Sequence, residues 1–210
     1  TTWRMHPDLC APVSTLSYEG KLESNKDVTQ SRSLSGLEPG LHVVLLDHHG
    51  NSTDSIEEAD EIVTRVRSLL GRPWVDPAHG SDPRPMQQSD FLVVAAYNAQ
   101  VAVIVEQLAA AGLDEVSVGT VDKFQGRQAP VVLISMAASA IEDVPRGMGF
   151  LLSRNRLNVA ISRGQWAAIL VRSRALTHYL PSTPDGLVTL GTFMRLCENA
   201  RQPNAIPSPR

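Results

Sequence analysis

Short aliphatic runs alternate along the chain with longer segments in which apolar residues recur at helical spacing. The predicted strands are the aliphatic runs at residues 41–46, 91–95, 116–119, 130–136 and 166–171. The predicted helices span residues 55–70, 98–111, 153–162, 176–180 and 188–199. Strands that alternate with helices predict an α/β fold, in which a mostly parallel sheet carries helices on both faces.

The apolar spacing also predicts which helix faces turn inward. Ser55 and Glu58 have the spacing of a capping box, and Gly71 ends the helix that they begin. The expected inward residues of this helix are Ile56, Ala59, Ile62, Val63, Val66 and Leu70. In the next helix the expected inward residues are Val101, Val105 and Leu108.

Three segments lack such patterns and divide the chain. Residues 1–40 are polar and are expected to form an irregular N-terminal segment, and residues 71–90, with four prolines, a surface connection. Residues 41–200 form the predicted domain. Residues 201–210 contain three prolines and are expected to be a flexible tail.

Composition narrows the class of protein. The chain has 210 residues, of which 42% are hydrophobic, which suits one domain with a sizeable core. A net charge of −3 argues against a protein that passively coats nucleic acid, which would usually be basic. It does not exclude a motor domain, which needs only a local groove. The two cysteines match no metal spacing, which favours a reduced, cytoplasmic setting, or the nucleus in a eukaryote. No apolar run reaches the ~20 residues that span a bilayer, so no membrane partner is expected.

Four polar segments stand where chemistry is expected. They lie at residues 3–7, 94–101, 120–130 and 157–164, and most adjoin a predicted strand or helix. In this order they resemble the arginine motif, motif IV, motif V and motif VI of superfamily 1 helicases, in the form of the nonsense-mediated-decay and Dna2-type family. The resemblance implies the second RecA-like motor domain of such an enzyme.

The chain has no Gly-x-x-x-x-Gly-Lys-Ser/Thr segment and no Asp-Glu pair after an aliphatic run. In the family these groups, which bind ATP with Mg²⁺, lie on the first RecA-like domain. We therefore expect an excised second domain, inactive alone, from an ATP-dependent helicase whose other partner is single-stranded DNA or RNA.

The resemblance assigns Arg163 and Arg4 as arginines that stabilise charge on the γ-phosphate of ATP. Arginine suits this task because its planar fork stays charged and binds oxygens in pairs. Position alone offers plainer alternatives. Arg163 could compensate a helix dipole, worth ~0.3–1 kcal/mol, and Arg4 could be an ordinary surface residue.

Four more residues fall on the family's nucleotide-binding positions. Trp3 stands where the family has a tyrosine that packs on the base. The alternative is a partly buried tryptophan that pins its loop to the core. Gln125 and Gly126 form a turn that either contacts the nucleotide or is a plain hairpin. Gln128 stands where the family usually has glutamate. A carboxylate can accept two hydrogen bonds from the ribose hydroxyls, whereas an amide offers one carbonyl and two N–H donors, so ribose recognition at Gln128 is in doubt.

Five residues are predicted to hold the nucleic acid. Thr120 matches a phosphate-binding position, and the Tyr97–Asn98 turn opens a helix, where free N–H groups bind phosphates. Asn98 could equally be a simple N-cap. Asn158 and Ser162 lie one helical turn apart and could bridge the nucleotide and the strand, or only cap and solvate the helix.

Other polar features have plainer interpretations. His48 and His49 point to opposite sides of a strand and are not expected to share a metal. The acidic run of residues 57–61 fits an exposed first turn of a helix. Arg154 and Arg156 lie near a helix start, where the dipole disfavours them, which hints at a phosphate or acidic partner.

Two rival hypotheses follow. A degenerate helicase-like module could bind nucleic acid or a protein without hydrolysis; Gln128 and the acidic balance favour it, and the intact Arg4 and Arg163 disfavour it. A Rossmann-type nucleotide binder fails because no Gly-x-Gly-x-x-Gly follows a strand.

Overall fold

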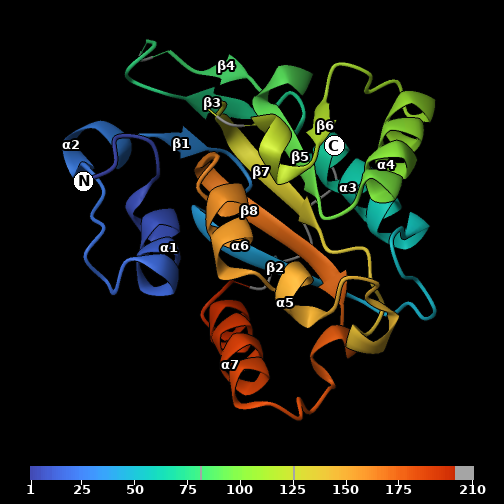
Figure 1. The fold of residues 1–210 in the computed structure, drawn as a ribbon. Coiled ribbons are helices and arrows are strands. Elements are labelled where there is room, and N and C mark those ends of the chain that lie inside the picture. Colours follow the sequence, from blue (N-terminus) through green and yellow to red (C-terminus); the bar gives the residue numbers. More distant parts are fainter. Residues whose placement is uncertain (81, 125, 202–210) are drawn as a thin grey trace.

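The protein is built around a five-stranded sheet whose strands all run in the same direction. The computed structural model describes residues 1–80, 82–124 and 126–201, and the sheet has the order β2-β8-β7-β5-β6 (Figure 1). The strands are β2 (Gly40–Leu46), β5 (Phe91–Ala95), β6 (Ser117–Gly119), β7 (Ala129–Ser135) and β8 (Gly164–Ser173). Every neighbouring pair is parallel. The predicted α/β, RecA-like sheet is therefore confirmed.

Helices cover both faces of this sheet, as the buried strands require. Along β7, Val132 and Ile134 belong to one apolar core and Val131 and Leu133 to the other, because successive side chains point to opposite faces. The first face carries α1 (Pro7–Ser17), α6 (Arg154–Ile161) and α7 (Pro184–Glu198), and the second α3 (Ile56–Leu69) and α4 (Asn98–Ala110) (Figure 1).

The inward faces of α3 and α4 differ in part from the prediction. Ala59, Ile62 and Val66 are fully buried as expected, but Ile56 is 54% exposed and Leu69 replaces Leu70 in the core. In α4, Val105 is 48% exposed and Ile104 is buried instead. Helical spacing alone leaves the rotation of a helix uncertain by one residue, and packing against the sheet decides it.

The N-terminal segment is not irregular, which corrects the prediction. Residues 7–17 form α1, whose Leu9 and Val13 are fully buried, and the helix packs on α6, β2 and β8. Pro12 inside the helix masked it in the sequence, because proline normally interrupts a helix interior, whereas Pro7 stands at the first helical position, where proline is tolerated. Two short elements follow, α2 (Lys26–Thr29) and β1 (Ser33–Leu34).

The proline-rich connection is also structured. β3 (Pro73–Val75) and β4 (Arg84–Pro85) pair antiparallel, and β1 joins β3 to complete a three-stranded sheet. Trp74 on β3 is 2% exposed and packs edge to face on Trp166 at 6.1 Å between ring centroids. The hairpin is thus fixed to the main core by a buried aromatic pair, which a proline count could not predict.

The remaining described elements are short: η1 (Gln88–Asp90), η2 (Val121–Phe124), η3 (Ile141–Asp143), α5 (Met148–Leu151) and η4 (Ala175–Thr177). Of the predicted flexible tail, only Arg201 lies within the described residues, and its backbone bonds to Leu41 and Val43.

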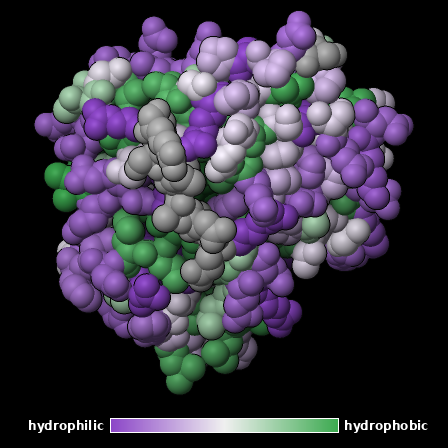
Figure 2. Space-filling view, turned by 180° about the vertical axis from the view of Figure 1, so that it is seen from behind, coloured by the Kyte–Doolittle hydropathy of each residue, from purple (hydrophilic) through white to green (hydrophobic). Residues whose placement is uncertain are grey.

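Apolar side chains reach the surface mainly around α7. Leu180 is 82% exposed and Val188 69% exposed, and hydrophobic atoms gather at the lower edge of the molecule in Figure 2. Within residues 1–80, 82–124 and 126–201, no helix has the length and hydropathy needed to cross a bilayer.

The buried hairpin generates a stability prediction. Trp74→Ala should lower the free energy of unfolding by about 3–5 kcal/mol, because it removes a large buried side chain and leaves a cavity against Trp166. Trp3→Ala is the matched control, since Trp3 is 63% exposed and its loss should cost less than about 1 kcal/mol. Urea unfolding monitored by circular dichroism measures both. A Trp74→Ala cost as small as that of Trp3→Ala would show that the hairpin does not depend on this contact.

Candidate functional site

The predicted site residues gather at two opposite edges of the sheet. Gln128 and Arg163 directly precede β7 and β8, whose first residues pair with each other. Tyr97 follows β5 and Thr120 follows β6, at the other ends of the parallel strands. A strand of this length separates the edges by roughly 20 Å. Only the second edge is the carboxyl edge, where α/β sheets usually place functional groups.

Arg4 is fixed at the amino edge by its side chain and its backbone. Its Nε donates to Gln128 Oε1 at 2.9 Å, and its Nη1 donates to the Ser162 carbonyl at 2.9 Å. Its own carbonyl accepts a hydrogen bond from Nη1 of Arg32. These contacts join the N-terminal segment to the C-terminal end of α6 and to the start of β7.

Arg163 lies beside Arg4. Burial lowers the pKa of Arg4, and the nearby positive charge of Arg163 lowers it further. Arg163 Nε is buried and has no hydrogen-bond partner among the described residues. Two adjacent cations with an unused buried donor form a favourable site for an anion. An anion would relieve the repulsion between the two charges and accept a hydrogen bond from the free N–H group.

Gly164 allows the close packing that holds Arg163 in place. A Cβ atom on this residue would lie 2.9 Å from the carbonyl oxygen of Ala167 and 2.9 Å from Cδ2 of Leu9. Helix α1 therefore packs directly against the turn after Arg163.

Arg32 and Asp76 support Arg4, and no pattern in the sequence marks either residue. Arg32 Nε donates to Asp76 Oδ1 at 3.1 Å, and both side chains are nearly fully buried. Asp76 follows β3, so the hairpin reaches Arg4 through this ion pair. Only the fold brings residues 4, 32 and 76 together.

Gln128 is exposed, and its carbonyl oxygen already accepts from Arg4. What remains for a ligand in this arrangement is mainly its amide N–H₂ group. A hollow of about 330 Å³ opens beside it, lined also by Gln165, Trp74 and Asp76.

The other predicted nucleotide-binding residues have few contacts. Trp3 is 63% exposed, which leaves its indole face accessible. Gly126 has φ +83°, a value that favours glycine, and space is open around it. Gln125 lies outside the described residues.

At the carboxyl edge, Tyr97, Asn98 and Thr120 line one hollow of about 380 Å³. Tyr97 is the N-cap of α4 and makes no side-chain capping bond there. Asn98 is the first residue of α4, so it is not the N-cap that the plainer interpretation expected. The sequence placed the Tyr97–Asn98 turn and Thr120 in separate motifs, and the fold brings them together.

The hollow also contains residues that the sequence assigned no such role: Thr53, Asp122, Arg146, Phe150 and Arg156. Among them only Arg156 had drawn notice, because its place at a helix start hinted at a phosphate or acidic partner. Arg146 lies in the turn after η3, where no periodic pattern marks it.

Asn158 and Ser162 do not join this hollow. Asn158 Nδ2 donates to Tyr18 Oη at 3.5 Å, and its Oδ1 is buried without a partner among the described residues. Ser162 Oγ donates to the Val159 carbonyl at 3.1 Å, while its own carbonyl accepts from Arg4. Ser162 is thus part of the amino-edge group.

A buried polar network lies between β2, β7 and the start of α3. Glu58 is fully buried; it accepts from Ser135 Oγ at 2.6 Å and from the Ala137 N–H at 2.9 Å, and lies 3.2 Å from His48 Nε2. Gln100 Oε1 accepts from the Ser55 N–H at 2.6 Å. The prediction of an exposed acidic run is therefore wrong at Glu58.

The same network changes the expectation of a capping box and contains one of the two adjacent histidines. The capping box is half formed: Ser55 Oγ accepts from the Glu58 N–H, but the Glu58 carboxylate turns inward. His48 is buried and His49 is exposed. Among the described residues, no group of three or more His, Cys, Asp or Glu side chains could hold a metal ion.

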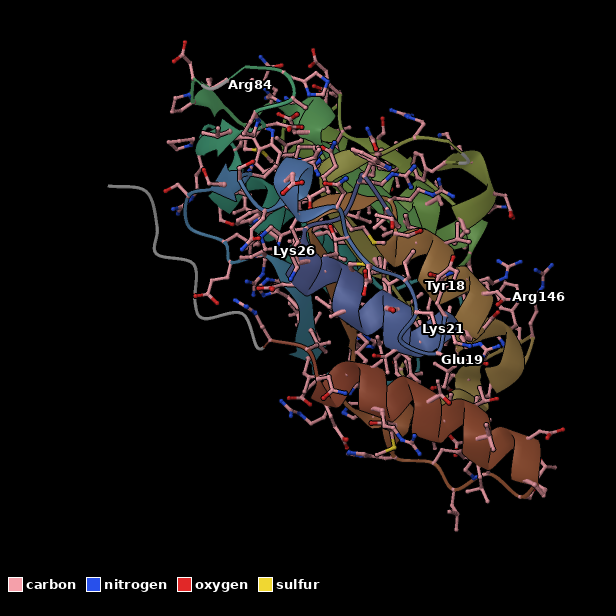
Figure 3. The ribbon with its side chains drawn as sticks, turned by 90° about the vertical axis from the view of Figure 1, so that its left-hand side faces the viewer. Tyr18, Glu19, Lys21, Lys26, Arg84 and Arg146 are labelled. Atoms are coloured by element: carbon pink, nitrogen blue, oxygen red, sulfur yellow. The ribbon has the colours of Figure 1, made fainter. Side chains whose placement is uncertain are left out.

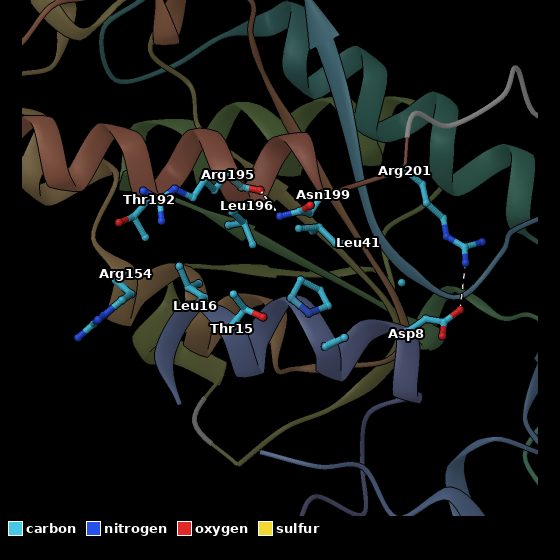
Figure 4. Close-up of a pocket in the computed structure, with 13 residues that line it drawn as sticks. Asp8, Thr15, Leu16, Leu41, Arg154, Thr192, Arg195, Leu196, Asn199 and Arg201 are labelled. Carbon is cyan, nitrogen blue, oxygen red and sulfur yellow. Dashed lines mark hydrogen bonds and ion pairs between the residues drawn. The ribbon is translucent and has the colours of Figure 1, made fainter. Parts of the chain in front are cut away.

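A larger hollow of about 630 Å³ lies away from both groups, between α1 and α7. Figure 4 shows Arg154 and Arg195 at one end and the Asp8–Arg201 ion pair at the other. None of the predicted binding residues lines it.

The chain is similar to known proteins over most of its length. The family model described as "AAA domain" matches residues 1–175. The mouse 3'-5' exoribonuclease HELZ2 is 28% identical over 207 residues, covering 86% of this chain and 7% of that protein. The chicken DNA replication ATP-dependent helicase/nuclease DNA2 is 28% identical over 170 residues, covering 80% and 16%.

Among solved structures, the C-terminal domain of a possible DNA helicase from Lactobacillus plantarum WCFS1 covers 84% of this chain and 90% of that chain, at 12% identity and a TM-score of 0.49. The chain spans a small part, 7% and 16%, of the two relatives above. It belongs to the AAA domain family, as the second RecA-like domain of a superfamily 1 helicase of the Dna2 and nonsense-mediated-decay type.

Proposed function

We propose that this domain is the C-terminal motor domain of an ATP-dependent helicase. Its amino-edge arginines would act on ATP bound against a first RecA-like domain of the same protein, which would hold the Mg²⁺. Its carboxyl-edge hollow would grip single-stranded DNA or RNA. The adjacent, pre-positioned pair of Arg4 and Arg163 is the observation that carries this proposal.

The chemistry follows from the charges. Hydrolysis of a nucleoside triphosphate develops negative charge on the transferred phosphoryl group, and an arginine that reaches it when two domains close stabilises that charge. Arg163 offers a buried donor without a partner among the described residues. Arg4 is held by Gln128 and Ser162, so little side-chain freedom remains to be lost when it binds an anion.

Gln128 fits this proposal better as a support than as a ribose acceptor. Its carbonyl oxygen accepts a hydrogen bond from Arg4. Trp3, the residue before Arg4, would offer its exposed aromatic face to the base. Gln125 and Gly126 stay predictions as further nucleotide contacts. Gly126 is exposed, so a nucleotide could reach it.

The strand contacts rest on the shared hollow. Thr120 offers a hydroxyl and Asn98 an amide, beside the first N–H groups of α4, and such groups hold phosphates without reading sequence. Asn158 and Ser162 remain candidate bridging residues, with Ser162 on the Arg4 side.

The arginine pair generates the second prediction. In the full-length protein, Arg163→Ala and Arg4→Ala should each lower kcat for ATP by ~10³-fold or more, because each removes charge stabilisation from the transition state. Arg67→Ala is the control: Arg67 is exposed and donates to the Ala111 carbonyl on the far side of the fold. Strand-stimulated ATPase assays give kcat, and thermal unfolding tests the fold.

A lower melting temperature with unchanged kcat would contradict the proposal. In that case the arginines are structural, and the domain is a helicase-like module that binds a partner without contributing to hydrolysis.

A further inference from the structure

Two arginines pack around one phenyl ring at the carboxyl edge. The guanidinium carbon of Arg146 lies 4.8 Å from the centroid of Phe150, and that of Arg156 lies 4.4 Å from it. We call these three residues the arginine–phenylalanine clamp. Cation–π attraction favours each contact separately, yet it also holds two like charges close together.

No acidic group of the described chain neutralises the clamp. Neither the guanidinium of Arg146 nor that of Arg156 makes an ion pair or a hydrogen bond with another residue in the described ranges. Arg156 lies in the first turn of α6, where the helix dipole adds to the repulsion. The site therefore gathers positive potential that an anion would offset.

Phe150 of the clamp packs against a buried aromatic ring. The Phe150 ring lies 5.5 Å from the Tyr97 ring at an interplanar angle of 35°, and Tyr97 is 8% exposed. Burial raises the pKa of the Tyr97 hydroxyl, while the charge of Arg146 opposes this rise. Tyr97 is thus a neutral platform next to the cations and does not pair with them as a phenolate.

The clamp faces the same space as the predicted strand contacts. Arg146, Phe150 and Arg156 line the 380 Å³ hollow with Asn98 and Thr120. Figure 3 shows Arg146 at the edge of the molecule, where its side chain extends outward. Stacking on the ring leaves the N–H groups of each guanidinium, which lie in its plane, free to bind oxygens in pairs.

One carboxylate also lines the hollow. Asp122 is exposed and makes no ion pair with either arginine. A single exposed acid leaves the hollow with a positive balance, two arginines against one aspartate.

We propose that Arg146 and Arg156, held by Phe150, bind phosphates of the nucleic-acid backbone next to Thr120 and Asn98. This inference rests on the proposed function, because it extends the strand site with two further contacts. Phosphate is the ligand that the chemistry favours: two forked cations recognise tetrahedral anions, and a base edge would need a matched acceptor pattern instead.

The test measures single-strand binding by the full-length protein as salt is varied. Fluorescence anisotropy is recorded with mixed-sequence and homopolymer strands of both DNA and RNA. Arg146→Gln and Arg156→Gln should each weaken binding about tenfold for every strand. Each should also reduce the magnitude of the slope of log K against log salt by roughly 0.7, because one phosphate contact is lost.

Arg154→Gln is the matched control. Arg154 lies on the same helix, carries the same charge and is exposed, but it lines the hollow between α1 and α7. Its loss should change affinity by less than about twofold and leave the slope unchanged. Arg156→Lys should keep most of the slope while losing affinity, since the charge remains but the paired donors do not.

Thr120→Val separates the clamp from the strand site as a whole. If Thr120→Val weakens binding while Arg146→Gln and Arg156→Gln behave like Arg154→Gln, the clamp proposal is overturned and the proposed function stands. A loss confined to one sequence would also overturn it, because phosphate contacts are independent of sequence. A wild-type protein that binds none of the strands would overturn both.

Discussion

Five parallel strands buried on both faces are the constraint on which every site in this protein depends. Parallel pairing forces each connection to travel the length of the sheet, so the turns at its two edges carry different groups. The amino edge holds Arg4, Gln128 and Arg163, and the carboxyl edge holds Tyr97 and Thr120. The separation of nucleotide and strand sites in our proposal follows directly from this geometry.

Residues 120–124 and 126–128 lie between one edge of the sheet and the other. They start at Thr120 in the strand hollow and end at Gln128, which holds Arg4. Phe124 among them is fully buried, and Lys123 Nζ donates to the Val118 carbonyl at 2.7 Å. A segment anchored in the core between two sites is a physical route by which a shift at one could reach the other.

Hydrophobic periodicity predicted the parts of this structure that depend on local sequence. All five strands of the main sheet and most of its covering helices were predicted because aliphatic runs and helical spacing are local signals. Helix α1 was missed because Pro12 inside it contradicts the usual helix signal. The hairpin was missed because its burial depends on Trp166, which is distant in sequence. The family resemblance supplied Arg4 and Arg163 as candidates, but their support by Arg32 and Asp76 arises only in three dimensions.

The same limit applies at the carboxyl edge. The resemblance supplied Tyr97, Asn98 and Thr120, whereas Arg146 and Phe150 had no signal in the sequence. Glu58 shows the opposite error: an acidic run predicted exposure, yet a buried histidine, a serine and a backbone N–H hold its carboxylate in the core. Local charge patterns do not reveal a partner that the fold delivers from elsewhere.

In our proposal the two edges of the sheet serve different ligands, and a comparison of two variants of the full-length protein tests this most directly. Steady-state ATPase is measured against strand concentration for Thr120→Val and Arg163→Ala, with strand affinity measured separately. Thr120→Val should raise the strand concentration for half-maximal stimulation and keep kcat near the wild-type value. Arg163→Ala should lower kcat and leave strand affinity unchanged. If Arg163→Ala weakens strand binding and leaves kcat intact, or Thr120→Val lowers kcat at saturating strand without changing affinity, the assignment of the two edges is contradicted.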